Sequence, residues 1–311
     1  MQTILGSGGS IGYELAKELI NYTDEIRLVS RNPTKVNKSD IVFSADFTDA
    51  NQINQAVKGS EICYITVGFE YNTKIWQQQW PFFIKNVVEA CIQYNSKLVF
   101  FDNVYAIGKE NMHRITESSP ISPCSKKGEI RARIDQYIIE QVEKGKIEAI
   151  IARAPDFFGA VKKQNSLILN LVYDNLAKAK TAQWFSNADV IHTMGYTPDL
   201  AKGTAILGNS SESYNQIWNL PVDMNALTGR EWVKLFAEEM NTKDDVKVLP
   251  VWLIKLLGIF VPILKEMPEM MYQFDRPYYF DSSKFNQKFN FTSKDNKTAV
   301  KQTIEKLKRV N

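Results

Sequence analysis

Three glycines near the amino terminus stand at a spacing that suits phosphate binding. They follow the apolar run Thr3–Leu5 and precede an amphipathic stretch that ends near Ile20. Glycine there allows a sharp turn, a close approach of the backbone to a pyrophosphate, and packing of the helix on the strand. The next helix would direct free N–H groups and its positive dipole end at the phosphates. We therefore predict a dinucleotide site at Gly6, Ser7, Gly8, Gly9, Ser10, Ile11 and Gly12.

The second apolar run ends in a cation instead of a carboxylate. Residues 30–33 read Ser-Arg-Asn-Pro, and Lys35 follows. A site for NAD would carry an acidic residue here for the ribose 2′-hydroxyl. Arg31 suits a 2′-phosphate because a guanidinium forms bidentate, charge-assisted hydrogen bonds. The sequence thus favours NADP over NAD; the alternative is that Arg31 is a surface charge stacked on adenine.

The Gly6-x-x-Gly9-x-x-Gly12 spacing resembles the short-chain dehydrogenase/reductase superfamily, in particular its extended and atypical members. The resemblance implies that Asp46 and Phe47 meet the adenine. It also implies that small residues line the cofactor where the fourth strand closes, at Thr66, Val67 and Gly68. The segment Arg153–Gly159 is similar to the one that flanks the nicotinamide in the family's epimerases and dehydratases, which places Pro155 at the cofactor.

The catalytic motif of that family is altered. Its active members use a serine after strand five and a Tyr-x-x-x-Lys pair on the next helix, where the spacing puts both side chains on one face. Tyr105 and Lys109 have this spacing, but Gly108 lies between them and the segment directly follows a strand, so we expect a loop. Asn103 falls at the serine position. Tyr105 either projects into the site or packs under the substrate lobe.

On the next helix, Lys127 and Arg131 occupy the tyrosine and lysine positions. Arginine does not give up its proton in a protein, so Arg131 can only bind ribose or phosphate oxygens. Lys127 is either a general acid, if burial and Arg131 depress its pKa, or a solvated lysine at the helix start. We predict Asn103, Tyr105 and Lys127 as the groups that polarise a substrate oxygen.

The elements that position these residues alternate along the first half of the chain. Short apolar runs at 3–5, 26–29, 41–43, 62–65, 98–101 and 147–152 predict strands, and 73–94 and 126–144 predict long helices. Runs without polar alternation are typical of strands covered on both faces. We predict an α/β fold: a doubly wound parallel-sheet Rossmann domain of residues 1–155, completed by 189–221. Residues 156–188 and 222–311 would form a smaller, mostly helical substrate lobe, with 156–190 mostly helical.

Aromatic side chains in both parts predict a substrate pocket for a small, partly apolar molecule. Trp76 and Trp80 are four residues apart, a spacing that also suits a helix core. We expect the pocket to be lined by Phe69, Trp80, Phe157, Tyr196 and Tyr272.

Bulk composition limits the other classes of function. The net charge of +3, with mixed signs along the chain, gives no reason to expect nucleic acid. Cys63, Cys91 and Cys124 have no metal-ligand or disulfide spacing, and His113 and His192 are isolated, so we expect no metal site. The apolar run Val251–Leu264 is too short to span a bilayer and is expected to be a buried or partly exposed, kinked helix; the alternative is an element on a membrane surface. Free thiols and the absence of a secretory leader indicate a cytoplasmic protein without membrane contact.

Two functions remain open. One is an NADP-dependent oxidoreductase or epimerase/dehydratase-like enzyme for a small carbonyl or hydroxyl compound, or for a nucleotide sugar. The other is a non-catalytic NADP sensor, which the altered motif suits. By analogy with relatives, the two long helices would pair in a homodimer.

Overall fold

The computed structural model describes residues 1–162 and 165–310. Within these residues, seven parallel strands form one sheet in the order β10-β6-β5-β4-β1-β2-β3. The strands are β1 Gln2–Leu5, β2 Ile26–Ser30, β3 Ile41–Ser44, β4 Ile62–Ile65, β5 Lys97–Asp102, β6 Ala149–Arg153 and β10 Gln216–Asn219. The order reverses beside β1 and β4, and in such sheets ligands bind outside the carboxyl ends of the strands at this reversal.

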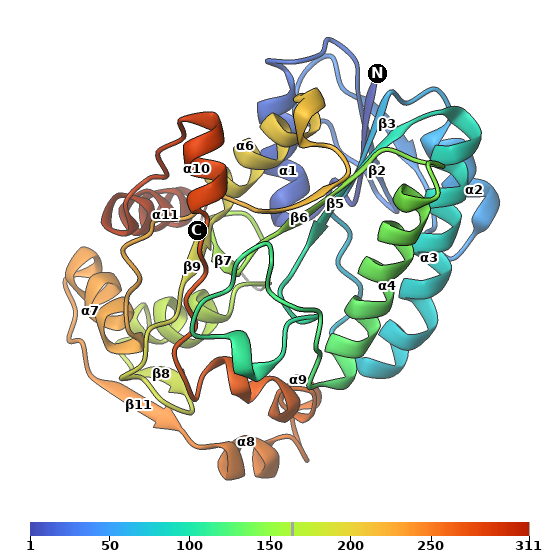
Figure 1. The fold of residues 1–311 in the computed structure, drawn as a ribbon. Coiled ribbons are helices and arrows are strands. Elements are labelled where there is room, and N and C mark those ends of the chain that lie inside the picture. Colours follow the sequence, from blue (N-terminus) through green and yellow to red (C-terminus); the bar gives the residue numbers. More distant parts are fainter. Residues whose placement is uncertain (163–164, 311) are drawn as a thin grey trace. The chain divides into compact units, whose positions relative to one another are not determined.

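Helices cover both faces of the sheet, as the predicted doubly wound fold requires (Figure 1). One face carries α1 (Ser10–Leu19) and α6 (Thr197–Gly208). The other carries α2 (Ala50–Val57), α3 (Thr73–Tyr94) and α4 (Lys126–Glu143). The side chain of Asn72 caps α3 by accepting hydrogen bonds from the backbone N–H groups of residues 74 and 75. The predicted strands and long helices of this half are confirmed, with boundaries that shift by up to two residues.

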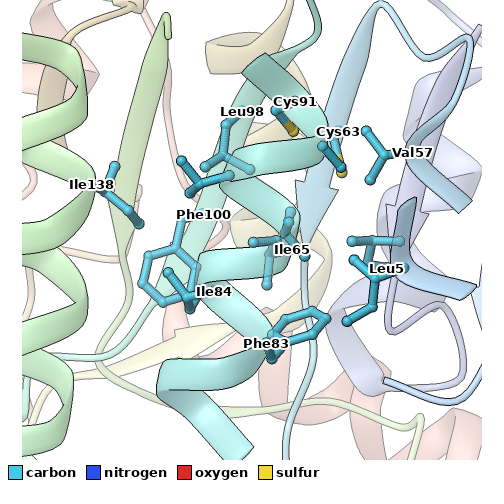
Figure 2. Packing of buried hydrophobic residues seen from close by; sticks show 14 of the residues in the cluster. Leu5, Val57, Cys63, Ile65, Phe83, Ile84, Cys91, Leu98, Phe100 and Ile138 are labelled. Atoms are coloured by element: carbon cyan, nitrogen blue, oxygen red, sulfur yellow. The ribbon is translucent and has the colours of Figure 1, made fainter. Parts of the chain in front are cut away.

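The main core lies between the sheet and α3. Figure 2 shows Cys63 and Ile65 of β4 facing Ile84 and Cys91 of α3, with Phe100 of β5 beside them. Each of these side chains is at most 1% exposed. Both buried cysteines therefore serve as small apolar residues.

The chain divides into two compact units. The first comprises residues 1–106, 127–154 and 200–220, and the second comprises residues 107–126, 155–199 and 221–311. Within the predicted completing segment 189–221, β10 joins the large sheet. The strand β9 (Met194–Tyr196) instead pairs with β7 (Asp156–Phe158). Their hydrogen bonding is independent of the large sheet, so this part of the segment belongs to the second unit.

The second unit also differs from the mostly helical expectation for 156–190. Besides β7, this stretch contains β8 (Ala182–Phe185), which pairs with β11 (Val246–Leu249). Aromatic residues in β7 and β8 fit half-buried strands as well as helices, so their composition did not separate the two. The described α-helices of this unit are α5 Asp174–Leu176, α7 Gly229–Met240, α8 Val251–Leu257, α9 Pro262–Lys265, α10 Ser283–Phe289 and α11 Asn296–Val310. It also contains the 3-10 helices η1 Lys109–Asn111 and η5 Pro268–Gln273 and the π-helix η3 Leu169–Tyr173. A further short turn, η4, covers Ser211–Ser213 in the first unit. Among the described helices, none has the length and apolar character to cross a bilayer.

Candidate functional site

The turn between β1 and α1 leaves no room for a side chain at two of its glycines. Gly6 has φ +97°, and a Cβ atom there would lie 2.7 Å from the backbone nitrogen of Val67. A Cβ atom on Gly12 would lie 2.6 Å from the carbonyl oxygen of Gly6. The hydroxyl of Thr66 ties β4 to the turn by donating to the carbonyl oxygens of Leu5 or Gly6, at 3.2 and 3.3 Å. The predicted turn therefore depends on glycine for backbone reasons.

The same turn has groups that suit phosphate. Ser7 is 5% exposed, and its hydroxyl has no hydrogen-bond partner among the described residues. Gly9 caps α1 without a side-chain hydrogen bond, so no side chain competes for the first N–H groups of the helix. An added Cβ on Gly68 would meet nothing within 4 Å. An orphaned buried hydroxyl, a helix start free of capping side chains and open space at Gly68 fit the phosphates of a dinucleotide.

The residues predicted to bind the adenine end of the cofactor, Arg31, Asp46 and Phe47, follow β2 and β3. Arg31 is exposed. Asp46 is also exposed, and its Oδ1 atom accepts hydrogen bonds from the backbone N–H and the hydroxyl of Thr48, both at 2.9 Å. These two bonds, followed by the nearby charge of Arg31, lower the pKa of Asp46. The ring of Phe47 packs on Phe83, with centroids 5.0 Å apart. Asp46 therefore stays a carboxylate near an exposed guanidinium.

Lys127 lies inside the protein at the start of α4. It is fully buried, and its Nζ atom donates a 2.9 Å hydrogen bond to the hydroxyl of Thr73. The same atom lies 4.7 Å from the centroid of the Tyr71 ring, within the range of a cation–π contact. The alternative of a solvated lysine at the helix start is therefore wrong. The Nζ atom of Lys127 is therefore held in place inside the protein by Thr73 and Tyr71.

Tyr105 joins this cluster from a loop. Its ring stacks on Trp76, with centroids 6.2 Å apart, and its hydroxyl lies 3.4 Å from that of Tyr71. The Oδ1 atom of Asn103 accepts a hydrogen bond from the backbone N–H of Tyr105, which shapes the loop. As predicted, Tyr105 and Lys109 do not share a helix face. Tyr105 and Lys127 thus both contact Tyr71, whereas the side chain of Asn103 bonds within its own loop.

Arg131 is 3% exposed and bound to Asp102 at the end of β5. Its guanidinium donates two hydrogen bonds to the Oδ1 atom of Asp102, one of them 2.6 Å long from Nε. It lies between the rings of Trp80 and Phe100, at 4.3 and 4.8 Å from their centroids. We predicted that Arg131 binds the cofactor ribose. Its described hydrogen bonds go to Asp102, so it would have to share its guanidinium with this ion pair.

A second buried pair continues the cluster along α4. The Asp135 carboxyl lies 3.4 Å from the guanidinium of Arg153 on β6, and neither side chain is exposed. Burial, and then the neighbouring charge of Asp102, raise the pKa of Asp135 well above its usual range. Burial therefore keeps the proton on Asp135 up to a higher pH than in the unfolded chain. Lys127, Arg131 and Asp135 follow one another at four-residue spacing, a signal that marks one helix face.

The second unit contains a buried histidine with two acceptors. His192 is 1% exposed. Its Nδ1 atom lies 3.1 Å from the carbonyl oxygen of Gln273, and its Nε2 atom lies 2.9 Å from the Oδ2 atom of Asp156. A carbonyl oxygen only accepts, so Nδ1 would donate to Gln273, while the carboxylate of Asp156 lies within hydrogen-bond distance of Nε2. His192 is isolated in the sequence; β7 and β9 bring it to Asp156.

The residues predicted to contact substrate have different settings. The indole of Trp80 is 1% exposed within the core, against Phe69, Phe83 and Phe100. Pro155, Phe157, Tyr196 and Tyr272 belong to the second unit. Tyr196 donates a 3.2 Å hydrogen bond to Gln302. Of the predicted lining residues in the first unit, partly buried Phe69 is more open than Trp80.

The sequence analysis missed buried polar residues in each of the two units. Thr73, Asp135, Arg153 and the Asp156–His192 pair were not assigned a role. The four-residue spacing from Arg131 to Asp135 could have identified that carboxylate, whereas only the fold brings Arg153 and His192 to their partners. Among the described residues, no group of three His, Cys, Asp or Glu side chains could hold a metal ion.

Solved structures with the same fold include three enzymes of sugar metabolism. A double mutant of DesIV, the dTDP-glucose 4,6-dehydratase of Streptomyces venezuelae, is 14% identical with a TM-score of 0.82, over 99% of this chain and 97% of that one. The UDP-glucose 4-epimerase of Thermus thermophilus is 15% identical with a TM-score of 0.78, over 99% of both chains. That of Thermotoga maritima is 14% identical with a TM-score of 0.81, over 100% of this chain and 99% of that one.

The first two of these were solved with NAD and the third with UDP-glucose. The comparison with curated proteins returns no match. The model of the NAD dependent epimerase/dehydratase family matches residues 3–220, which include the glycine turn and the whole cluster on α4. This match covers most of the chain, and the chain therefore belongs to the NAD dependent epimerase/dehydratase family.

Proposed function

We propose that the chain binds NADP in preference to NAD and acts as an oxidoreductase or epimerase/dehydratase-like enzyme on a small carbonyl or hydroxyl compound. The observation that carries this proposal is the β1–α1 turn, with its two side-chain-intolerant glycines and the orphaned Ser7 hydroxyl. Family membership supports the same cofactor class. Calorimetric titration of NADPH into the wild type and Ser7→Ala tests the cofactor site.

The preference for NADP rests on Arg31. Its side chain is exposed just after β2. Hydrogen bonds from Thr48, and then the charge of Arg31, lower the pKa of Asp46. A guanidinium binds a 2′-phosphate well. Titration of NADPH and NADH should give tighter NADPH binding. Arg31→Asp should weaken NADPH binding at least ~10-fold and leave NADH unchanged or improved. Lys38→Asp makes the same charge change in the same loop and should have a smaller effect; tighter NADH binding in the wild type would contradict the preference.

The cluster around Lys127 provides the groups for proton transfer. When bound, a nicotinamide ring supplies or accepts a hydride. Lys127 is oriented by Thr73 and Tyr71, so its ammonium is positioned to polarise a substrate oxygen. Tyr105 and Asn103 lie on the neighbouring loop. Lys127→Met should lower kcat by about 10²–10⁴-fold while NADPH affinity changes little; an unchanged kcat would remove Lys127 from the reaction.

A nucleotide sugar is the second substrate class. The relatives solved with such ligands support it by fold alone. A diphosphate needs cations, and Arg276 of the second unit already forms an ion pair with Asp275. We therefore rank a small carbonyl or hydroxyl compound first. Screening both classes for loss of NADPH absorbance separates them.

A non-catalytic NADP sensor is the second candidate function. The observation that favours it is the ion pair of Arg131 with Asp102, because the family's lysine position is then used for structure. A sensor would bind NADPH tightly, yet no carbonyl, hydroxyl or nucleotide-sugar compound would consume it. Turnover of any of these compounds that is lost in Lys127→Met would exclude this candidate.

A further inference from the structure

A group of large apolar side chains stands exposed on the second unit. Six residues of α8, α9 and the turn between them are at least 40% exposed, with Ile259 at 72% and Phe260 at 80%. We call residues 251–264 the apolar tip; its exposed members are Trp252, Leu256, Ile259, Phe260, Val261 and Ile263. Single exposed apolar residues are ordinary, but contiguous ones mark interaction sites. The expectation of a buried or partly exposed helix therefore understated its exposure.

The apolar tip is folded and not a loose loop. At Gly258 the backbone of Lys265 comes so close that a Cβ atom would lie 2.9 Å from its nitrogen, so α8 and α9 form a tight hairpin. The backbone N–H groups of Phe260 and Val261 donate to the carbonyl oxygen of Leu257 at 3.0 and 2.9 Å. Fully buried Ile254 anchors α8, which packs against η5. The exposed side chains are therefore presented at little further cost in conformational entropy.

The charges nearest the apolar tip favour one kind of partner. Lys255 is the one charged residue among 251–264, and Lys247 and Lys265 flank this stretch, with the acidic residues Asp244, Asp245 and Glu266 just beyond them. All three lysines are exposed. In a two-fold dimer centred on this surface, the same patch would meet itself and lysines would face lysines. Anionic lipid headgroups attract such lysines, while apolar side chains enter the boundary of the acyl chains and tryptophan suits the interface.

We propose that the apolar tip inserts into the surface of an anionic phospholipid bilayer and so binds the protein to the membrane face without spanning it. This reverses the expectation from sequence that the protein makes no membrane contact. The proposal stands apart from the proposed catalytic function, because it uses none of the residues around Lys127 or the glycine turn.

Sedimentation with vesicles tests the proposal on the full chain. Phosphatidylcholine vesicles that contain phosphatidylglycerol should bind the protein, and pure phosphatidylcholine vesicles should bind it much less. The double variant Ile259→Gln, Phe260→Gln should weaken binding about tenfold or more, since both side chains would be buried in the bilayer. Lys255→Glu, Lys265→Glu should remove the preference for anionic vesicles. Ile20→Gln, a change of an apolar residue 53% exposed on the first unit, is the matched control and should bind normally.

Light scattering identifies the competing occupant. No binding to either vesicle type, or equal binding by the glutamine double variant, would overturn the proposal. A dimer that dissociates in the double variant would also overturn it, because a second copy would then cover the apolar tip. Circular dichroism and a thermal melt should show both double variants folded, since the substituted side chains are exposed.

Discussion

At the β1–α1 turn, backbone atoms approach one another so closely that glycine is required. On α4, by contrast, the four-residue spacing of the family is kept while the side chains at those positions differ. The turn has a buried Ser7 hydroxyl without a partner among the described residues, and space is open at the nearby Gly68. The face of α4 directs Lys127, Arg131 and Asp135 inward, where Arg131 and Asp135 meet Asp102 and Arg153. The turn thus depends on backbone geometry, whereas the arrangement on α4 depends on pairs of side chains.

The largest expected effect breaks the buried ion pair on α4. Arg131→Ala would leave the Asp102 carboxylate buried without its partner, which costs about 3–5 kcal/mol in the free energy of unfolding. The exposed residue Arg133 on the same helix supplies the control, and Arg133→Ala should change stability by less than about 0.5 kcal/mol. Urea unfolding measures both. Equal losses in the two variants would show that the pair contributes nothing particular to the fold.

The next effect concerns the turn. Gly6→Ala combines a positive φ with a Cβ atom 2.7 Å from the nitrogen of Val67. We expect a loss of about 1 kcal/mol from φ and a further ~1–3 kcal/mol from overlap. Gly145 has φ +64° but open space around its Cβ position, so Gly145→Ala should show only the first part. The difference between the melting temperatures of the two variants measures the cost of overlap between the added Cβ atom and Val67. Identical melting temperatures would refute the close approach of Val67 to Gly6.

The sequence predicted the β1–α1 turn better than it predicted the charged residues on α4. Gly6, Gly9 and Gly12 predict the turn because positions without space for a Cβ atom require glycine, and this requirement is visible in residue type and spacing. The charged residues on α4 were predicted only in part: the sequence placed Lys127 and Arg131 on one helix face but did not predict their burial. Arg131 is buried against Trp80, Phe100 and Asp102 of α3 and β5, and Lys127 against Tyr71 and Thr73; all of these are distant from α4 in sequence. The pairing of His192 with Asp156 likewise exists only once β7 and β9 meet.

The raised pKa of Asp135 on α4 predicts that the stability of the protein depends on pH. Its pKa is raised in the folded protein, so the native state binds a proton that the unfolded state releases near pH 4. Stability should therefore fall as pH rises from about 4 towards the raised pKa, by up to about 1.4 kcal/mol per pH unit. Asp135→Asn should remove this slope in urea titrations at a series of pH values, whereas the exposed Asp24→Asn should keep it. A slope that persists in Asp135→Asn would assign it to other groups.

The smallest effect concerns the loop that carries Tyr105. Tyr105→Phe removes a hydroxyl 3.4 Å from that of Tyr71 and keeps the stacking on Trp76. We expect a loss of only about 0.5 kcal/mol in stability, because this contact is long for a hydrogen bond between hydroxyls. A loss of turnover much larger than this change would give the Tyr105 hydroxyl a part in the reaction. Steady-state kinetics beside a thermal melt makes that distinction.

The most direct test of the dinucleotide site is calorimetric titration of NADPH into the wild type and Ser7→Ala. The Ser7 hydroxyl is buried without a partner among the described residues, so its removal should leave the free energy of unfolding unchanged or slightly higher. NADPH binding should weaken about tenfold, because a charge-assisted hydrogen bond to phosphate is lost. If instead Ser7→Ala loses stability and binds NADPH as the wild type does, or if the wild type does not bind NADPH, the account of the glycine turn is contradicted.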